Sequence, residues 1–351
     1  MRITTKPQSG SGLLGLRLFA ILLIVLLIAS FEDEPDFCMD EIANTILASG
    51  RSAVELALFI LLPIMTVMLS LMRWLESVGW LNRIVAFCTP LLRPFGLSGL
   101  GVFALIQATM VSFAAPVATL AVMAKTGSAP RNIAATLAMV LALAQGNVVF
   151  PMAAAGLDVP VTMLISLIGG LLAAACTFYL FGKDLSLESR GPETSSGELV
   201  DTDAKGLMNV IRRAGSDAWD IAIGAMPLLI VALVFINLVK LTGAVEMLEG
   251  LIAPVFAFTG YPIETLVLAL TKYVAGGTAM MGIVMEQFQT GVLSAQQINL
   301  LAGTLICTLD IAGVAILVSA GKPVAAVARP AIYGALVGIA FRIGAHSWLY
   351  L

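Results

Sequence analysis

Four runs without a single Asp, Glu, Lys or Arg constrain this chain more than any other feature. They cover residues 98–124, 132–157, 159–182 and 221–239. A helix needs roughly 20 apolar residues to cross the hydrocarbon core of a bilayer, and the strands of a barrel would instead alternate in segments of about 10. The chain is 59% hydrophobic and only 12% charged, whereas soluble domains carry about 25% charged residues. The sequence therefore predicts an all-α integral membrane protein.

Residues 13–30 form a further apolar run, which follows Arg2 and Lys6. A secretory signal peptide also begins in this way. A transmembrane anchor is favoured, because the run is longer than a usual signal core and the acidic stretch EDEPD after it is a poor cleavage site. We expect residues 1–50 to comprise an N-terminal transmembrane helix and an external acidic loop.

Enzyme motifs and metal-ligand clusters are missing from the sequence. The four cysteines include no CxxC pair, and there is no GxxxxGK[ST], HExxH or GxSxG motif. The single histidine, His346, lies among the last six residues near Trp348 and Tyr350, which predicts an interfacial side chain. We expect a protein that is not an enzyme, has no cofactor or bound metal, and does not bind nucleic acid.

A polar segment divides the chain into two halves. Residues 183–217 are rich in Ser, Gly, Glu and Asp, and such a segment cannot bury itself, so it predicts a linker. The halves, 51–182 and 218–351, resemble each other at an offset of 164 to 165 residues, which predicts two related membrane units. The matched residues are Pro63 and Pro227, Gly79 and Gly243, Pro90 and Pro254, Gly96 and Gly260, and Gly156 and Gly321.

Positive charges predict the topology, because cytoplasmic segments are enriched in Lys and Arg. The run 98–124 has Arg93 before it and Lys125 and Arg131 after it. Both of its ends are therefore predicted to be cytoplasmic, and the run must form a re-entrant hairpin, broken near Pro116. Each half then has an odd number of full crossings, so the second half is inverted.

This topology predicts a bacterial inner-membrane protein with a cytoplasmic N-terminus and a cytoplasmic linker. Of its 19 Lys and Arg residues, 15 are cytoplasmic; Arg51, Lys240 and Arg342 are external, and Lys272 alone lies in the membrane. The second hairpin covers about residues 263–288 and contains the stretch LTKYVAGGTAMMG. Irregular backbone at membrane depth must be covered by protein or line a cavity. We therefore expect Gly276, Gly277 and Thr278 to form a hairpin tip whose free N–H groups face a ligand.

The intramembrane charges are the first candidates for a functional site. Lys272 is predicted to face the interior, where it contacts a polar or anionic solute or a neighbouring carboxylate; snorkelling to the interface is the alternative. Asp310 lies within the apolar segment 297–321, and its repeat mate is Gln145. Both are followed by glycine within three residues, which predicts paired helix breaks. We expect Asp310 to couple transport to protons or sodium, or to form a structural ion pair with Lys272.

Further polar residues complete the candidate set. Asn147 is expected either to bind the solute or to tie helices together, and the same alternatives hold for Gln107, Thr109 and Ser112 on the first hairpin. Glu286 follows the second hairpin, and it is either an ion-coupling carboxylate or an interfacial one. Two inverted repeats, each with a re-entrant hairpin and an interrupted helix, are a known design of secondary transporters.

The two halves resemble the nucleoside-recognition, or Gate, domain family. The resemblance rests on PLLRPFGLSGLGVFALIQATMVSFAAP and its inverted counterpart PVFAFTGYPIETLVLALTKYVAGGTAM. Members include the core of concentrative nucleoside transporters, the gate of ferrous iron transporters and the spore maturation proteins. The resemblance implies two hairpins and two interrupted helices around a midplane site. Nucleoside transporters carry Gln-Thr-Glu-x-Pro in the first hairpin, whereas residues 112–116 read SFAAP, so only the proline is kept.

Together these patterns favour an ion-coupled secondary transporter of a small polar solute, nucleoside-like or other, that works by alternating access. The alternative is a non-transporting membrane component that acts with a partner, as the resemblance to the paired spore maturation proteins implies. The expected partners are the solute and the lipid bilayer, with a homo-oligomer or a second Gate-domain protein as further possibilities.

Overall fold

The fold is described from a computed structural model, which covers residues 39–112, 114–188, 207–241 and 260–351. The described residues form helices joined by short connections and contain no strand. Four helices among them are long and apolar enough to cross a membrane, or five if one bent pair is counted as a span. The prediction of an all-α membrane protein is confirmed. The predicted anchor at 13–30 and the repeat matches at Gly243 and Pro254 lie outside the described residues.

The first repeat begins with one long helical rod and continues into a bent pair and a hairpin. The rod consists of α2 (Met39–Glu55), the π-helical turn η1 (Leu56–Leu61) and α3 (Leu62–Ser77). Helix α4 (Trp80–Leu92) and the turn η2 (Arg93–Phe95) then meet α5 (Gly99–Met110) at 104°. Helix α6 (Pro116–Lys125) packs back against α5. The predicted hairpin at 98–124, with its break before Pro116, is therefore present.

An interrupted helix and a long final helix complete this repeat. Helix α7 (Pro130–Ala142) is followed, after a break, by α8 (Gly146–Met152) and the turn η3 (Ala153–Ala155). Helix α9 (Val159–Cys176) and the π-helical turn η4 (Thr177–Phe181) lead to the polar segment.

The described part of the second repeat follows the first from the hairpin onwards. It contains α10 (Leu207–Leu241), the hairpin α12 (Thr265–Ala275) and α13 (Gly277–Gln289), the interrupted helix α14 (Ala295–Leu305) and α15 (Ile311–Val318), the short α16 (Lys322–Ala326) and the final helix α17 (Ala328–Tyr350). Helices α7 and α14 begin at residues 130 and 295, and α8 and α15 begin at 146 and 311, so both pairs are 165 residues apart. The repeat seen in the sequence is therefore a repeat of structural elements.

Two predicted boundaries are wrong. Helix α2 already begins at Met39, so the boundary placed at residue 50 falls inside a continuous helix rather than after an external loop. Helix α10 begins at Leu207, although the linker was expected to run to residue 217. Asp217 forms an ion pair with Arg73 of α3, and this contact holds the polar first turns of α10 against the membrane helices.

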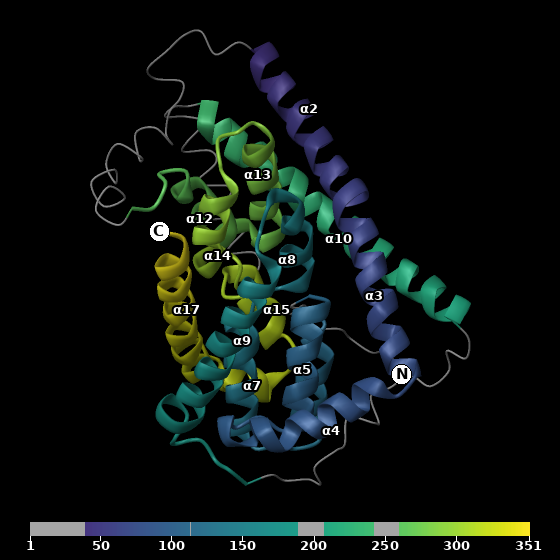
Figure 1. Cartoon of the computed structure of the whole chain (residues 1–351), viewed down its shortest axis with the longest axis vertical. Helices are drawn as coiled ribbons and strands as arrows, with labels where there is room; N and C mark the ends of the chain where they lie inside the picture. Colours follow the sequence, from purple (N-terminus) through teal and green to yellow (C-terminus); the bar gives the residue numbers. More distant parts are fainter. Residues whose placement is uncertain (1–38, 113, 189–206, 242–259) are drawn as a thin grey trace, which may run out of the picture.

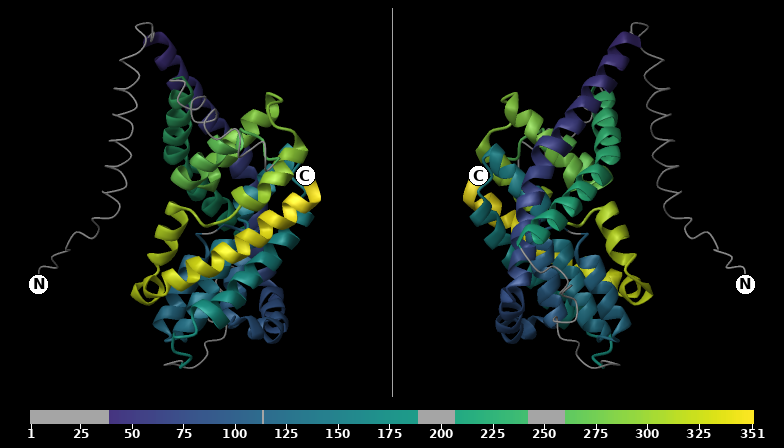
Figure 2. Two further views of the ribbon diagram at one scale, coloured as in Figure 1. Left: turned by 90° about the vertical axis from the view of Figure 1, so that its left-hand side faces the viewer. Right: turned by 90° about the vertical axis from the view of Figure 1, so that its right-hand side faces the viewer.

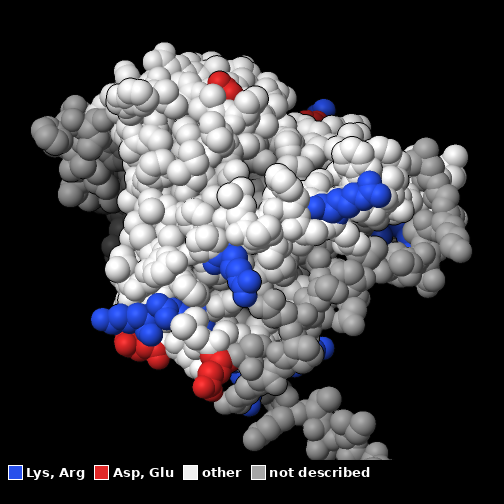
Figure 3. Space-filling model, turned by 60° about the horizontal axis from the view of Figure 1, so that its bottom comes forward, with Lys and Arg blue, Asp and Glu red and all other residues white. Residues whose placement is uncertain are grey.

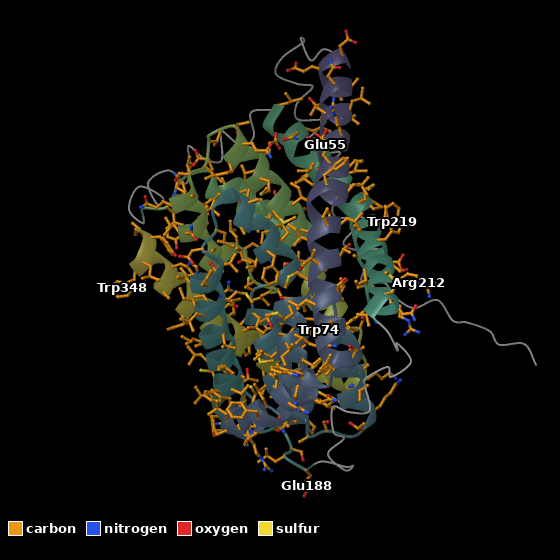
Figure 4. The ribbon with its side chains drawn as sticks, turned by 45° about the vertical axis from the view of Figure 1, so that its right-hand side comes forward. Glu55, Trp74, Glu188, Arg212, Trp219 and Trp348 are labelled. Atoms are coloured by element: carbon orange, nitrogen blue, oxygen red, sulfur yellow. The ribbon has the colours of Figure 1, made fainter. Side chains whose placement is uncertain are left out.

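The long rod and α10 cross each other in opposite directions on one side of the molecule (Figure 1). Near one end of the pair Arg73 contacts Asp217, and towards the other end Asn237 Nδ2 donates to Ser49 Oγ over 3.0 Å. Figure 4 shows Glu55 and Trp74 along the rod, with Trp219 and Arg212 on α10. Helix α17 is not part of this crossed pair and packs against α7, α9 and α14 (Figure 2).

Several Lys and Arg side chains, with a few Asp and Glu among them, are exposed in the view that brings one end of the bundle forward (Figure 3). The main-chain N–H of Arg131, at the start of α7, donates to Ser186 O over 3.4 Å, and its guanidinium lies 4.5 Å from the Phe178 ring centroid. Tyr179 Oη in turn donates to Pro94 O over 2.6 Å. The neighbourhoods of Arg93, Arg131 and Lys183 thus share one end, as the predicted topology requires. The compartment that this end faces stays a prediction.

The ion pair between Arg73 and Asp217 is expected to contribute little to stability. Both side chains are partly open, at 31% and 39% exposure, and ion pairs in contact with water contribute about 0.2–1 kcal/mol. Arg73→Ala should lower the free energy of unfolding by at most about 1 kcal/mol, measured by thermal unfolding in detergent. Arg83→Ala, at an exposed residue of α4, is the matched control, and a loss several times larger for Arg73→Ala would mean that the pair excludes water.

Candidate functional site at the crossing of two interrupted helices

The two interrupted helices cross at their breaks. The break between α7 and α8 spans residues 143–145, and the break between α14 and α15 spans residues 306–310. Thr308 N donates to Leu141 O over 3.1 Å, and Gln145 Nε2 donates to Cys307 O over 3.0 Å. Backbone groups that the broken helices release are thus satisfied by the other repeat, as buried polar groups require. We call residues 143–147 and 306–310 the crossing.

Local sequence explains where each break falls. Asp310 has extended backbone and is the N-cap of α15, where its Oδ1 accepts a hydrogen bond from Gly313 N over 2.6 Å. A carboxylate in this position stabilises the start of a helix through its hydrogen bond and its charge. At the start of α8, a Cβ on Gly146 would lie 2.6 Å from Thr109 O of α5. Only glycine allows the first hairpin to approach the crossing this closely.

The second hairpin turns against the same place. Gly276, between α12 and α13, has φ 94°, a conformation that favours glycine. A Cβ on the next residue, Gly277, would lie 3.4 Å from Gln145 Nε2. Asn147 Nδ2 donates to Thr278 Oγ1 over 3.4 Å. The predicted hairpin tip at residues 276–278 therefore contacts the predicted break at Gln145 and Asn147.

One ion pair lies in this interior. Lys272 Nζ contacts Asp310 Oδ2, and the two residues are 0% and 6% exposed. Lys272 comes from the second hairpin and Asp310 from the interrupted helix, so the pair joins the hairpin to the crossing. The expected contact of Lys272 with a neighbouring carboxylate is present, and its alternative of snorkelling to the interface is wrong. Asp310 is the one buried carboxylate in the part of the chain that the structure describes.

Two buried oxygens at the crossing accept no hydrogen bond from the described residues. They are Gln145 Oε1 and Asn147 Oδ1, whose side chains are 2% and 4% exposed. Their amide nitrogens are already engaged, with Cys307 O and Thr278 Oγ1. A buried acceptor without a donor is costly, by about 1–3 kcal/mol. These two oxygens are therefore suited to a ligand that donates hydrogen bonds or carries positive charge.

Three of the predicted residues make no hydrogen bond or ion pair with the crossing that the structure shows. Gln107 is half-buried and accepts a hydrogen bond from Thr119 Oγ1 over 2.7 Å, so it ties α5 to α6. Ser112 is buried at the turn of the first hairpin, 5% exposed. Glu286 is exposed on α13, nine residues after Gly277, or about 13 Å along the helix. The expectation that Glu286 belongs to an ion-coupling site is not supported by its position.

Two buried ionisable residues escaped the sequence reasoning. Arg342 was expected outside and His346 at the interface, yet both side chains are 0% exposed. The expectation for Arg342 came from the topology count and that for His346 from its nearness to Trp348 and Tyr350, and neither considered which face of the helix is packed. A usable signal was present, since Gly334, Gly338, Arg342 and His346 recur every four residues and therefore share one face of a helix. That face packs against α9 and α14 rather than lipid.

Comparisons with known proteins find no match for the sequence but a clear one for the fold. No family model and no curated protein matches the chain. Solved structures of CNTnw, a concentrative nucleoside transporter, do match it. The chain has the CNTnw fold. An outward-facing structure of a CNTnw double variant matches with a TM-score of 0.61 at 16% identity and covers 96% of this chain and 97% of CNTnw.

A second structure of CNTnw gives the same result. The inward-facing substrate-bound state matches with a TM-score of 0.59 at 18% identity and covers 95% of this chain and 88% of that one. The transporter-like core that the Gate resemblance implied is thus present as a fold. Membership of the Gate family stays a prediction, because identity this low speaks for architecture alone.

Proposed function

We propose that this protein is an ion-coupled secondary transporter that moves a small polar solute by alternating access. The observation that carries the proposal is the crossing itself. Two broken helices from inverted repeats meet there with both hairpins, and they bring Lys272, Asp310, Gln145 and Asn147 together in the buried interior. Ionisable groups inside a membrane are costly and commonly mark solute or ion pathways.

Each group has a proposed role. Gln145 Oε1 and Asn147 Oδ1 accept hydrogen bonds from the solute, because both are buried without a donor among the described residues. Lys272 contributes a positive charge once it leaves Asp310, and the tip at residues 276–278 closes over the solute. Asp310 takes up the coupling ion, a proton or sodium, because it is the buried carboxylate of the described residues. The solute class, nucleoside-like or other, is part of the proposal.

Uptake into proteoliposomes tests this function. We expect labelled nucleosides or nucleobases to accumulate when a proton or sodium gradient is imposed. Asn147→Ala removes an oxygen that is proposed to bond the solute. It should reduce this uptake at least about tenfold, because a tenfold loss of affinity corresponds to only about 1.4 kcal/mol of binding free energy. Gln296→Ala is the control, because that side chain is exposed and bonds Tyr350 O. Gradient-independent leakage, or equal loss in both variants, would contradict the proposal for these solutes.

The alternative is a membrane component that does not transport and acts with a partner. The observation that favours it is that Lys272 and Asp310 satisfy each other's charge. In this case neither gradient drives uptake of any solute in the panel, and the protein is recovered from native membranes with a second membrane protein. Association with further copies of this chain, and residence in a bacterial inner membrane, remain part of the proposal.

A further inference from the structure

Arg342 is a fully buried cation that contacts the edge of the crossing at Ile306 and is not among the groups proposed to bind the solute. It lies on α17 with 0% exposure, and no carboxylate of the described residues forms an ion pair with it. Its guanidinium donates to three carbonyl oxygens instead. Nη1 bonds Ala142 O over 2.6 Å, and Nη2 bonds Ile306 O over 2.8 Å and Ala302 O over 3.2 Å. A buried cation needs compensation, and here it comes from main-chain oxygens.

These three oxygens belong to the ends of two helices. Ala142 is the last residue of α7, Ala302 lies in the last turn of α14, and Ile306 is the C-cap of α14. The C-terminus of a helix carries roughly −0.5 of an elementary charge. Two such ends together present about −1, which one guanidinium matches. Arg342 therefore serves as the counter-charge for the helix ends at both breaks.

The packing around Arg342 is built for this contact. A Cβ on Gly303 of α14 would lie 2.7 Å from Arg342 O, and a Cβ on Gly169 of α9 would lie 2.6 Å from Arg342 Cγ. Both glycines leave room for the arginine between three helices. A lysine would not substitute for it, because a single ammonium lacks the planar fork that reaches two helix ends at once.

We propose that Arg342 is a positioning residue that ties the first halves of both interrupted helices, α7 and α14, to α17 as one body. Its bonds go to repeat 1 and repeat 2 alike, and α17 packs against α7, α9 and α14. This assignment does not rest on the proposed function.

Hydrogen exchange of the full chain in lipid nanodiscs tests whether Arg342 stabilises the ends of α7 and α14. The amides to follow are Leu143, which bonds Met139 O, and Ile306, which bonds Ala302 O. Arg342→Met should speed exchange at least about tenfold, or 1.4 kcal/mol, in peptides that cover 139–145 and 302–308, and not at the ends of α3 and α4. Arg329→Met is the control for charge, because Arg329 is exposed on the same helix.

Ile339→Ala is the control for packing, since Ile339 is 5% exposed and lies one turn before Arg342 on α17. We expect its effect to spread over α9 and α17 without singling out the two helix ends. The proposal is overturned if Arg342→Met gives that same spread pattern, or faster exchange at one end only. If Arg342→Met does not fold, Arg342→Lys is used, and it should speed exchange measurably at one or both ends. Exchange as slow as in the wild type at both ends would then overturn the proposal.

The exchange measurement does not use transport. A failed uptake assay together with faster exchange at both helix ends would remove the proposed function and leave the assignment of Arg342 intact. Normal uptake together with unchanged exchange would support the proposed function and overturn the assignment of Arg342.

Discussion

Asp310→Asn is expected to destabilise the protein by about 3–5 kcal/mol, the usual loss when one partner of a buried ion pair is removed. Asparagine keeps the shape of the side chain and still serves as an N-cap. Its amide oxygen can therefore accept the same hydrogen bond from Gly313 N. What changes is the charge. Lys272, at 0% exposure, is left without a counter-ion. Thermal unfolding in detergent measures the loss.

Lys272→Met should cost less than Asp310→Asn. The carboxylate that remains still has the Gly313 N–H and the start of α15 beside it. The double variant Lys272→Met/Asp310→Asn removes both charges and should regain most of the lost stability, because a buried pair is often replaced by uncharged residues at little cost. If Asp310→Asn lowered the free energy of unfolding by less than about 1 kcal/mol, the burial of the pair would be contradicted, because losses this small are typical of solvent-exposed ion pairs.

The double variant also separates structure from function. If it is stable but no longer accumulates solute, the pair belongs to the transport mechanism. If it is stable and transports normally, the pair is structural and the proposed roles of Lys272 and Asp310 fail. The same protein preparations answer both questions, because stability and uptake are measured on one set of variants.

Gly146→Ala is expected to have the second large effect. The added methyl group would lie 2.6 Å from Thr109 O and 2.9 Å from Met110 C. These are main-chain atoms of the first hairpin, which have no rotamer by which to yield. Overpacking of this kind costs about 1–3 kcal/mol, and it pushes the first hairpin away from the crossing. Uptake should fall at least about tenfold, the equivalent of about 1.4 kcal/mol.

Gly224→Ala is the matched control for this variant. Gly224 lies in the helix α10, and nothing stands within 4 Å of an added Cβ there. Alanine is the better helix former by roughly 0.5–1 kcal/mol, so this variant should be at least as stable as the wild type. If Gly146→Ala behaves like Gly224→Ala in both unfolding and uptake, the first hairpin does not press on the crossing.

Much of the fold followed from the sequence because the responsible signals are local. Long runs without charge demand helices in a bilayer whatever surrounds them. The breaks at Gln145 and Asp310 were predicted because a polar residue followed by glycine weakens a helix at that point. The same reasoning predicted the hairpin tip at residues 276–278. It failed at residues 39–50 and 207–217, where polar composition suggested loops and packing between α10 and the long rod produced helix.

Tertiary structure decided which of the alternatives left open for each charge holds. Arg342 lies 200 residues from Ala142, and Lys272 lies 38 residues from Asp310. Whether a charge is buried depends on which carbonyl or carboxylate arrives beside it, and segments far away in the sequence supply that partner. For this reason the sequence by itself determined the apolar helices, the repeat and the two breaks. Only the tertiary structure shows that Lys272 pairs with Asp310. It also shows that Arg342, which was expected outside, donates hydrogen bonds to the ends of α7 and α14.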